Sequence, residues 1–474
     1  QDFDGWCWPG QSSYLDFTDD KVREWWASRF ALDQYQGSTL DLYTWNDMNE
    51  PSVFNGPEVS MKKDCLSLAG VEHRHWHNTY GMYMQRATAE GLELARKGNV
   101  KGGGGGGDGR PFVLSRAFFA GSQRWGAVWT GDNAARWDHL AASAPMLLSM
   151  SLAGLPFVGA DVGGFFGDPS AELFLRWMQA AAYQPFFRSH AHHDSKRREP
   201  WVFGDPWTAR VRSVVMARYA LLPYWYTLFQ EASDTGMPMM RPMWVQYPSD
   251  ANTFDMDDQW MAGSDLLVKP VVTEGATVAS VYFPGTSSLS KDTGVHRDIE
   301  APIDKMPVFQ RGGSIIPRKQ RLRRSSLMMA GDPYTLVVAL DDEGKASGTL
   351  YLDDEESYDY RDKEGGVGRA TRRFSFEAGV LAGRAAEGSG VYRPANTIER
   401  VVIAGVASAP SSATLRMSGA AGGGGGPDGD GEPAEAVSLG FTYDAAARVV
   451  TVRKPDVGVV ENFDLTLAFG TEAS

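Results

Sequence analysis

The sequence predicts an α/β domain followed by β-sandwich structure. Over residues 1–235, short apolar runs that end in polar residues alternate with amphipathic stretches, which indicates a parallel sheet covered by helices. From about Met239 onward, short β-rich runs are separated by Gly, Pro and Asp, a pattern typical of a β-sandwich. The 474 residues exceed what one hydrophobic core usually organises, so we expect two or three domains.

Five segments of the first part are predicted to be buried strands, each ending in a charged or polar residue. They are 40–45, 111–116, 126–132, 155–161 and 183–190. Amphipathic periodicity predicts helices over 78–95, 138–152, 171–182 and 211–232. A (β/α)8 barrel and an open doubly wound sheet both place ligands at such strand ends, so this pattern alone leaves the choice open.

The second part is predicted to hold two β-sandwiches in series. Its β-rich runs are 265–272, 279–283, 307–317, 334–340 and 348–352. A break after the third run leads us to expect three domains, an α/β domain over 1–235, a proximal β-sandwich over 236–326 and a distal one over 327–474. Two glycine-rich stretches, 101–109 and 419–433, are interpreted as surface insertions.

Composition and charge narrow the class of partner. A formal net charge of −13 argues against nucleic acid and anionic membrane surfaces, and no apolar run reaches transmembrane length. The 15 Trp residues suit carbohydrate binding, because aromatic faces stack on sugar rings, although core packing also accounts for many of them. Two cysteines, Cys7 and Cys65, leave one disulfide or two thiols open.

Acidic residues follow two of the predicted strands. Asp47 and Glu50 lie within Trp45–Pro51, and Asp132 follows Trp129. Polar loops or helix caps would use the same residue types, but the flanking Trp and apolar strands favour the rim of a pocket. Cleavage of a glycosidic bond needs such a pair, one carboxylate that attacks and one carboxylic acid that protonates the leaving oxygen.

The two roles require different surroundings. The attacking carboxylate must stay ionised, and Arg116 and His190 are candidate neighbours because both lie at predicted strand ends. The acid must keep its proton near neutral pH, so we expect Asp132 either in an apolar, water-poor niche, to which Trp125 and Trp129 could contribute, or near another anion. The histidines near residue 190 do not form a convincing ligand set, and no metal or organic cofactor is expected.

Several segments resemble family 31 glycoside hydrolases. They are 45–54, 116–133, 159–165 and 187–190, with further similarity over 5–10, 308–317 and 332–340. Within that family the resemblance is to catalytic subunits that trim N-glycans in the endoplasmic reticulum. It implies a (β/α)8 TIM barrel, of which residues 1–235 supply the C-terminal portion with strands four to eight, followed by two β-sandwich domains.

The resemblance also implies roles for individual residues. Asp47 matches the nucleophile, Asp132 the general acid/base and Glu50 a supporting acid. The residues that match the sugar pocket are Arg116, His190, Trp8, Trp45, Met48, Trp129, Asp161 and Phe165. Packing alone remains an alternative for Trp8 and Phe165, and loop bracing remains one for Asp161.

The implied activity is that of a retaining exo-α-glucosidase acting on α-1,3-linked glucose of N-glycans. An α-xylosidase of the same family and a non-catalytic glycan-binding subunit are the alternatives. The family carries further barrel strands and one sugar-binding acid upstream of the matched region, so the 474 residues alone are expected to be inactive. The implied partners are a carbohydrate substrate, that N-terminal part of the protein and a regulatory β subunit. The implied location is the lumen of the endoplasmic reticulum.

Overall fold

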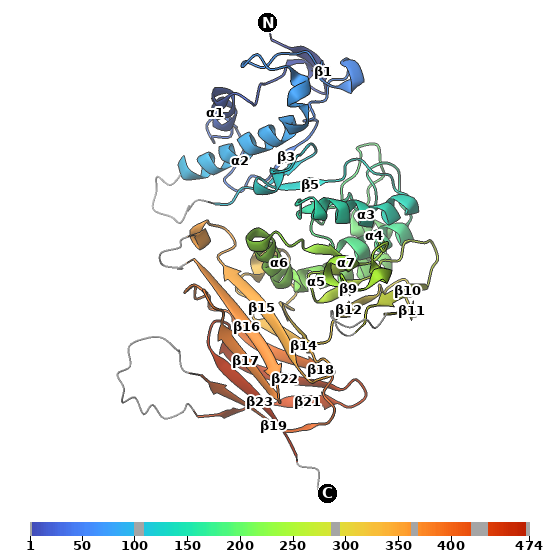
Figure 1. Cartoon of the computed structure of the whole chain (residues 1–474), viewed down its shortest axis with the longest axis vertical. Helices are drawn as coiled ribbons and strands as arrows, with labels where there is room; N and C mark the ends of the chain where they lie inside the picture. Colours follow the sequence, from blue (N-terminus) through green and yellow to red (C-terminus); the bar gives the residue numbers. More distant parts are fainter. Residues whose placement is uncertain (1, 99–108, 286–293, 362–367, 419–434, 471–474) are drawn as a thin grey trace, which may run out of the picture. The chain divides into compact units, whose positions relative to one another are not determined.

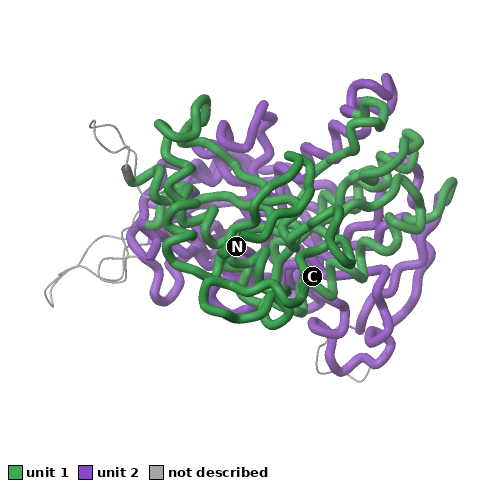
Figure 2. The backbone as a smooth tube through the Cα atoms, turned by 90° about the horizontal axis from the view of Figure 1, so that it is seen from above, with its two compact units in different colours: residues 1–198, 272–276, 356–358 green, residues 199–271, 277–355, 359–474 purple. Residues whose placement is uncertain are grey.

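The computed structural model describes residues 2–98, 109–285, 294–361, 368–418 and 435–470 (Figure 1). The chain forms two compact units (Figure 2). Unit 1 comprises 1–198, 272–276 and 356–358, and unit 2 comprises 199–271, 277–355 and 359–474. The predicted glycine-rich insertion 419–433 lies outside the described residues, as does 101–109 except for Gly109. Within the described ranges, no helix is both long and apolar enough to cross a membrane.

Unit 1 contains a parallel sheet of four strands in the order β3-β4-β5-β6. The strands are β3 (Thr44–Asn46), β4 (Val113–Ser115), β5 (Ala127–Trp129) and β6 (Val158–Gly159). Each overlaps one of the first four predicted strand segments, and β4, β5 and β6 are completely buried, as expected for a sheet covered on both faces. The register pairs Asn46 with Ser115 and Trp129 with Gly159, so the loops that follow the strands begin at one edge of the sheet.

The fifth predicted strand, 183–190, is wrong as a strand, because the structure has turns, bends and irregular backbone there. Two backbone hydrogen bonds still hold the segment beside β6. The Phe186 N–H donates to Val158 O (3.1 Å), and the Val162 N–H donates to Arg188 O (3.0 Å). Pro185 has no N–H to extend a ladder, which explains why the segment follows β6 without forming a regular strand.

The helices of unit 1 begin at recognisable caps in two cases. Unit 1 contains α1 (Asp20–Ser28), α2 (Tyr80–Gly98), α3 (Trp137–Leu152) and α4 (Ala171–Ala181). The Asp19 carboxylate accepts hydrogen bonds from two N–H groups of the first turn of α1, and the Ser170 hydroxyl accepts one from the Leu173 N–H of α4. The prediction missed α1 and the hairpin of β1 (Asp4–Cys7) and β2 (Gly10–Ser13).

Unit 2 begins with two helices where one was predicted. The segment 211–232 is divided between α5 (Trp207–Ala220) and α6 (Leu222–Thr235), so the prediction of a single helix is wrong. Pro223 lies in the first turn of α6, where its missing N–H cannot continue the hydrogen-bond ladder of α5. The proline therefore marks the boundary between the two helices.

A small two-layered β region follows α6. Its four-stranded antiparallel sheet has the order β12-β9-β8-β7, and β10 pairs with β11 in a separate hairpin. The elements are β7 (Met240–Pro242), α7 (Met243–Gln246), β8 (Trp260–Ala262), β9 (Leu266–Val268), β10 (Val278–Phe283), β11 (Val295–Glu300) and β12 (Val308–Gln310). Met261 and Leu267 of the sheet and Val281 of the hairpin share one apolar cluster, which joins the two layers.

The rest of unit 2 is an antiparallel-rich sheet of eleven strands. Its order is β20-β19-β23-β17-β16-β15-β13-β14-β18-β22-β21. The strands are β13 (Ser314–Arg318), β14 (Tyr334–Ala339), β15 (Ala346–Asp353), β16 (Arg369–Glu377), β17 (Val380–Ala385), β18 (Thr397–Ala404), β19 (Pro410–Met417), β20 (Val437–Ser438), β21 (Phe441–Asp444), β22 (Val449–Gly458) and β23 (Phe463–Phe469). Leu415 and Val450, from opposite halves of this order, pack in one core with Leu336, so the sheet folds over a shared interior.

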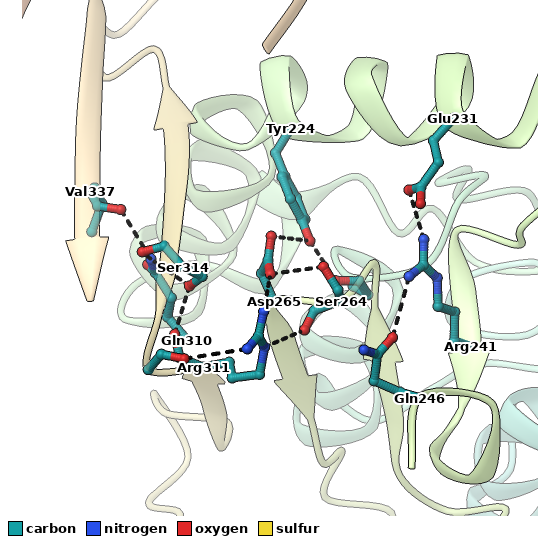
Figure 3. A network of polar contacts seen from close by, with 12 residues as sticks. Tyr224, Glu231, Arg241, Gln246, Ser264, Asp265, Gln310, Arg311, Ser314 and Val337 are labelled. Atoms are coloured by element: carbon teal, nitrogen blue, oxygen red, sulfur yellow. Dashed lines mark hydrogen bonds and ion pairs between the residues drawn. The ribbon is translucent and has the colours of Figure 1, made fainter. Parts of the chain in front are cut away.

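Polar contacts join α6 and the two β regions of unit 2 (Figure 3). The Tyr224 hydroxyl donates to Ala262 O (2.9 Å), and Arg311 pairs with Asp265 (3.2 Å). The Gln310 side chain donates to Val337 O (3.0 Å), which links β12 to the large sheet. The predicted run 307–317 therefore contains two strands with separate partners, since β12 pairs with β9 whereas β13 pairs with β14 and β15.

Candidate active site

The loop after β3 and the residue after β4 form an acidic cluster around one arginine. Arg116 Nη1 lies 3.1 Å from Asp47 Oδ1, and Arg116 Nε and Nη2 each donate to a Glu50 carboxylate oxygen at 2.8 Å. The pair with Glu50 is bidentate and fixes the plane of the guanidinium group. The contact with Asp47 is at ion-pair distance, but the buried Asp47 Oδ1 accepts no hydrogen bond from the residues that the structure describes. The positive charge of Arg116 therefore lies beside an oxygen that can still accept a hydrogen bond.

Electrostatic effects connect Asp47 with the second carboxylate. Burial raises the pKa of Asp47, Arg116 lowers it, and the charges of Asp132 and Glu50 raise it further. The pKa of Arg116 is raised chiefly by its hydrogen bond to Glu50, and Asp47 and Asp132 also contribute. The predicted acidic residues thus share one electrostatic environment, as expected for carboxylates at the same edge of a parallel sheet.

Of the two surroundings expected for Asp132, the water-poor niche is wrong, because Asp132 is exposed, whereas a nearby anion is present, since the charge of Asp132 acts on Asp47. Trp129, which ends β5 three residues earlier, is buried. The burial of this strand end therefore does not extend to Asp132.

A buried ion pair lies beside this cluster. Asp161 is 1% exposed and accepts a hydrogen bond from Arg188 Nη2 at 2.7 Å. Burial raises the pKa of Asp161 to about 6, against the opposing effect of the Arg188 charge. The Arg188 guanidinium lies over the rings of Trp129 (5.1 Å) and Trp45 (5.4 Å). Sequence reasoning missed Arg188 as a site residue, although it lies two positions before His190 in the same motif.

Aromatic contacts bring His190 to the same place. Its ring lies 5.1 Å from the ring of Trp45 and is stacked on Phe165 at 5.3 Å. Burial lowers the pKa of His190, and among the nearby charges Arg188 lowers it while Asp47 raises it. Segment 183–190 is not a strand, but it places Arg188 and His190 beside the carboxylate cluster.

Several buried polar atoms of this cluster have no hydrogen-bond partner in the part of the chain that the structure describes. They are Asn46 Oδ1, Asp47 Oδ1, Trp129 Nε1, Asp161 Oδ2 and Arg188 Nε. Buried polar groups are normally hydrogen-bonded, so these atoms are suited to a ligand that carries many hydroxyl groups. The arrangement combines such donors and acceptors with aromatic faces, which is what recognition of a sugar ring requires.

Two other predicted residues lie nearer the edge of the cluster. Trp8 is 76% exposed, and its ring contacts Phe54 at 4.8 Å in the loop that continues from Glu50. Met48 is half-buried between Asp47 and Asn49 and has a φ of 59°, in the left-handed region that non-glycine residues seldom adopt. The backbone therefore turns sharply between the residues that face Arg116.

One group in the described ranges has the composition of a metal site. The possible ligand atoms of His192, His193 and Asp194 lie within 4.8 Å of one another. His193 and Asp194 are exposed, and exposed clusters of this kind are common without an ion. We assign this group no part in the chemistry of Asp47 and Asp132.

Comparison with known proteins gives a consistent result. A model of the glycosyl hydrolases family 31 TIM-barrel domain matches residues 1–228, and one of the glycosyl hydrolase family 31 C-terminal domain matches 236–316. Neutral alpha-glucosidase AB of Dictyostelium discoideum is 50% identical over 98% of this chain and 48% of its own length. A probable glucan 1,3-alpha-glucosidase of Arabidopsis thaliana is 48% identical over 98% of this chain and 49% of its own length.

Solved structures agree. A Tris-bound glucosidase II alpha subunit superposes with a TM-score of 0.87 at 39% identity, over 99% of this chain and 50% of that one. An endoplasmic-reticulum glucosidase II heterodimer, of a catalytic subunit and the binding domain of a regulatory subunit, superposes with a TM-score of 0.88 at 38% identity. The match covers 98% of this chain and 50% of that one. The chain spans about half the length of the relatives it matches. The predicted fold class, part of a TIM barrel followed by β domains, is confirmed, and the chain belongs to glycosyl hydrolase family 31.

Proposed function

We propose that this chain carries the catalytic residues of a retaining α-glucosidase that removes terminal α-linked glucose, with α-1,3-linked glucose of N-glycans as its substrate. The observation that carries the proposal is the convergence of Asp47 and Asp132 on one electrostatic cluster centred on Arg116. The names of the relatives support α-glucosidase chemistry, and a glucan 1,3-alpha-glucosidase among them supports the linkage.

The proposed reaction proceeds by double displacement. In the first step, an Asp47 carboxylate oxygen bonds to the anomeric carbon while Asp132 donates its proton to the departing glycosidic oxygen. In the second step, Asp132 takes a proton from water, the water oxygen bonds to the anomeric carbon, and the ester bond to Asp47 breaks. Two inversions release glucose as the α-anomer and return both carboxyl groups to their starting states.

The surroundings of Asp47 suit a nucleophile. Burial works against its ionised form, and Arg116 at 3.1 Å works in favour of it. Glu50 takes up the other side of the guanidinium group, so Arg116 is fixed in place and its charge is shared between two acids. We assign Glu50 this supporting role and no step of bond cleavage.

The remaining residues are proposed to hold the glucose ring. Trp45 and Trp129 offer aromatic faces, and Phe165 packs on His190. Asp161, Arg188 and His190 offer polar atoms to the hydroxyl groups, and two of those atoms, Asp161 Oδ2 and Arg188 Nε, have no partner within the described residues. Met48 and Trp8 are assigned to the rim of the pocket, Trp8 with Phe54 beside it.

The partner and location belong to the same proposal. A related catalytic subunit has been crystallised with the binding domain of a regulatory subunit, and that enzyme is described as an endoplasmic-reticulum protein. We propose a regulatory subunit and the same compartment for this protein. The additional length of the relatives leads us to propose that activity also needs the rest of the barrel.

The test replaces each carboxylate in a form of the protein with a complete barrel. Asp47→Ala and Asp132→Ala should each lower kcat by several orders of magnitude, because the nucleophile or the proton donor is lost. Azide should then distinguish the roles. With an activated α-glucoside, Asp47→Ala should yield β-glucosyl azide by direct attack, and Asp132→Ala should yield α-glucosyl azide from the ester intermediate. NMR of the products identifies the anomer.

The control is Asp33→Asn, a change of an exposed aspartate in unit 1, which should leave turnover unchanged. Retention of hydrolysis in Asp47→Ala would show that the nucleophile is assigned to the wrong residue. Release of glucose as the β-anomer by the unaltered protein would exclude a retaining mechanism.

A further inference from the structure

We propose that Asn49 is a positioning residue that holds Arg116 against Asp47, an inference that rests on the proposed function. Asn49 is 2% exposed and lies in the same loop as Asp47 and Glu50. Its side chain bonds to both neighbours of Arg116. Asn49 Oδ1 accepts the Ala117 N–H at 2.9 Å, and Asn49 Nδ2 donates to Ser115 Oγ at 2.8 Å.

Further hydrogen bonds connect the residues on each side of Arg116. Ser115 Oγ, which accepts from Asn49, donates to Ala117 O at 2.7 Å. The Arg116 N–H itself donates to Asn46 O at 3.0 Å, just before Asp47. The backbone on each side of Arg116 is therefore attached to the 46–49 segment, and a shift of one segment relative to the other breaks several bonds at once.

Residues 47–50 contact the region of Arg116 in different ways. Asp47 and Glu50 contact its guanidinium group, and Asn49 accepts a hydrogen bond from the backbone of the next residue, Ala117. The left-handed conformation of Met48 lets these side chains face Arg116 from one short loop. Asn49 is thus separated from the reacting atoms and acts through Arg116.

Only a side chain with a donor and an acceptor can make the bonds of Asn49 to Ser115 and Ala117, and the same Nδ2 also donates to Gly81 O at 3.4 Å. An ionised aspartate accepts but does not donate, and alanine does neither. Because Ser115 is fully buried, the loss of the Asn49 donor also leaves a buried hydroxyl with fewer partners. The chemistry of the position therefore selects an amide.

The consequence concerns the ionisation of Asp47. The charged groups that act on Asp47 are Arg116 after β4, Asp132 after β5 and Glu50 in its own loop, and His190 of segment 183–190 interacts with it as well. Of these, Arg116 is the group that lowers the pKa of Asp47. If Arg116 moves away, burial and the two acids are opposed only by the backbone hydrogen bond of Met48 and the weaker influence of His190, and ionisation of Asp47 should require a higher pH.

The test is the pH profile of kcat/KM for Asn49→Ala and Asn49→Asp in the form with a complete barrel. The acidic limb of the profile should move to higher pH by about one unit, so that kcat/KM falls about tenfold at pH values below this limb. Ser115→Ala, which removes one of the two bonds from Asn49 to the neighbours of Arg116, should move the acidic limb in the same direction by less. This milder variant keeps the test decisive if Asn49→Ala does not fold.

The matched control is Asn396→Ala. Asn396 is also buried, at 7% exposure, and its side chain donates to Ala330 O and Asp332 O at 2.7 and 2.8 Å in unit 2. The Asn396→Ala variant should have a lower melting temperature, but the acidic limb of its kcat/KM profile should stay where it is in the unaltered protein. If the limb of Asn49→Ala and Ser115→Ala coincides with that of Asn396→Ala, Asn49 has a structural role only and the proposal is wrong.

A second measurement separates this inference from the proposed function. The affinity for the cationic iminosugar deoxynojirimycin, measured by calorimetry across pH, reports the charge of Asp47 without turnover. If the unaltered protein shows neither hydrolysis nor iminosugar binding, the proposed function fails. If it shows both and the pH dependence of binding in Asn49→Ala matches that of the unaltered protein, only the positioning role fails.

Discussion

Burial and charge oppose each other at two carboxylates of the candidate site, Asp47 and Asp161. Asp47 is pulled toward its protonated form by burial and toward its ionised form by Arg116, and Asp161 has the same relation to Arg188. In both cases the arginine also contacts a second feature, Glu50 for Arg116 and the two Trp rings for Arg188. Each counter-ion is thus held independently of the acid that it serves.

Asp161 should make the stability of the chain depend on pH. Its folded-state pKa of about 6 lies above the ordinary value of 3.8, so between these pH values the folded chain binds a proton that the unfolded chain has released. The associated stability is present below about pH 4 and is lost as the pH rises through 6, amounting to about 3 kcal/mol at most. Urea unfolding from pH 4 to 7 should therefore show a decline in the wild type that Asp161→Asn lacks.

The exposed Asp33→Asn variant serves as the control and should follow the wild type across this range. A free-energy difference between wild type and Asp161→Asn that stays constant from pH 4 to 7 would contradict the assigned shift. Asp161→Asn should also weaken sugar binding, since it removes the charge opposite Arg188.

At the scale of secondary-structure elements, the sequence predicted best where burial alone decides the conformation. β4 and β5 lie within predicted segments because their apolar residues are buried on both faces. Prolines account for two errors, at Pro185 in the fifth predicted strand and at Pro223 between α5 and α6. Both prolines can be read from the sequence. Their effect, however, depends on whether a residue with a backbone N–H would have made a hydrogen bond at that position, which the sequence does not show.

The site was predicted in part for a similar reason. Asp47, Arg116 and Asp132 follow β3, β4 and β5, and their convergence follows from parallel strands that end at one edge of the sheet. His190 was predicted at the end of a fifth strand, but it lies on a segment that is not a strand. The ion pair of Arg188 with Asp161 and the bonds of Asn49 depend on loop geometry, which periodicity does not encode. The domain boundaries at 235/236 and 326/327 stay predictions. β13, which precedes the second boundary, lies within the eleven-stranded sheet.

Gly159 should couple β6 to the segment that carries Arg188 and His190. A Cβ at Gly159 would lie 2.2 Å from Phe186 O, and neither backbone can move without breaking the bond between Phe186 and Val158. Gly159→Ala should therefore displace the 186–190 segment, lower the unfolding free energy by about 1–3 kcal/mol and reduce kcat/KM more than tenfold in the active form. Chemical unfolding and steady-state kinetics, below the melting transition, measure the two effects.

Gly331→Ala is the matched control, because a Cβ at Gly331 meets nothing within 4 Å. It should change neither quantity. Full activity in Gly159→Ala, together with a normal unfolding free energy, would mean that the segment 186–190 adapts without moving its side chains and that Gly159 has no part in placing them.

At the scale of the whole molecule, the small size of the parallel sheet leads us to expect that activity needs further barrel strands. Among the described residues it has four strands, with β3 and β6 at its two ends, whereas a (β/α)8 barrel closes with eight. An open edge of a parallel sheet leaves backbone N–H and C=O groups without partners. The edge at β6 is bonded in part to segment 183–190, and Asp132, in the loop after β5, is exposed. A polypeptide that supplies the other strands should satisfy those groups and cover the site.

The chain alone should therefore show no measurable α-glucosidase turnover, and co-expression with the other half of the barrel from a relative should restore it. The expected complex co-purifies, is more stable to heat than the chain alone and hydrolyses an α-1,3-linked glucose disaccharide. The same complex carrying Asp47→Asn should form equally well and remain inactive, which separates assembly from chemistry. Turnover by the isolated chain at the rate of the complex would mean that four strands are enough to organise Asp47, Asp132 and Arg116, and that the missing strands serve stability alone.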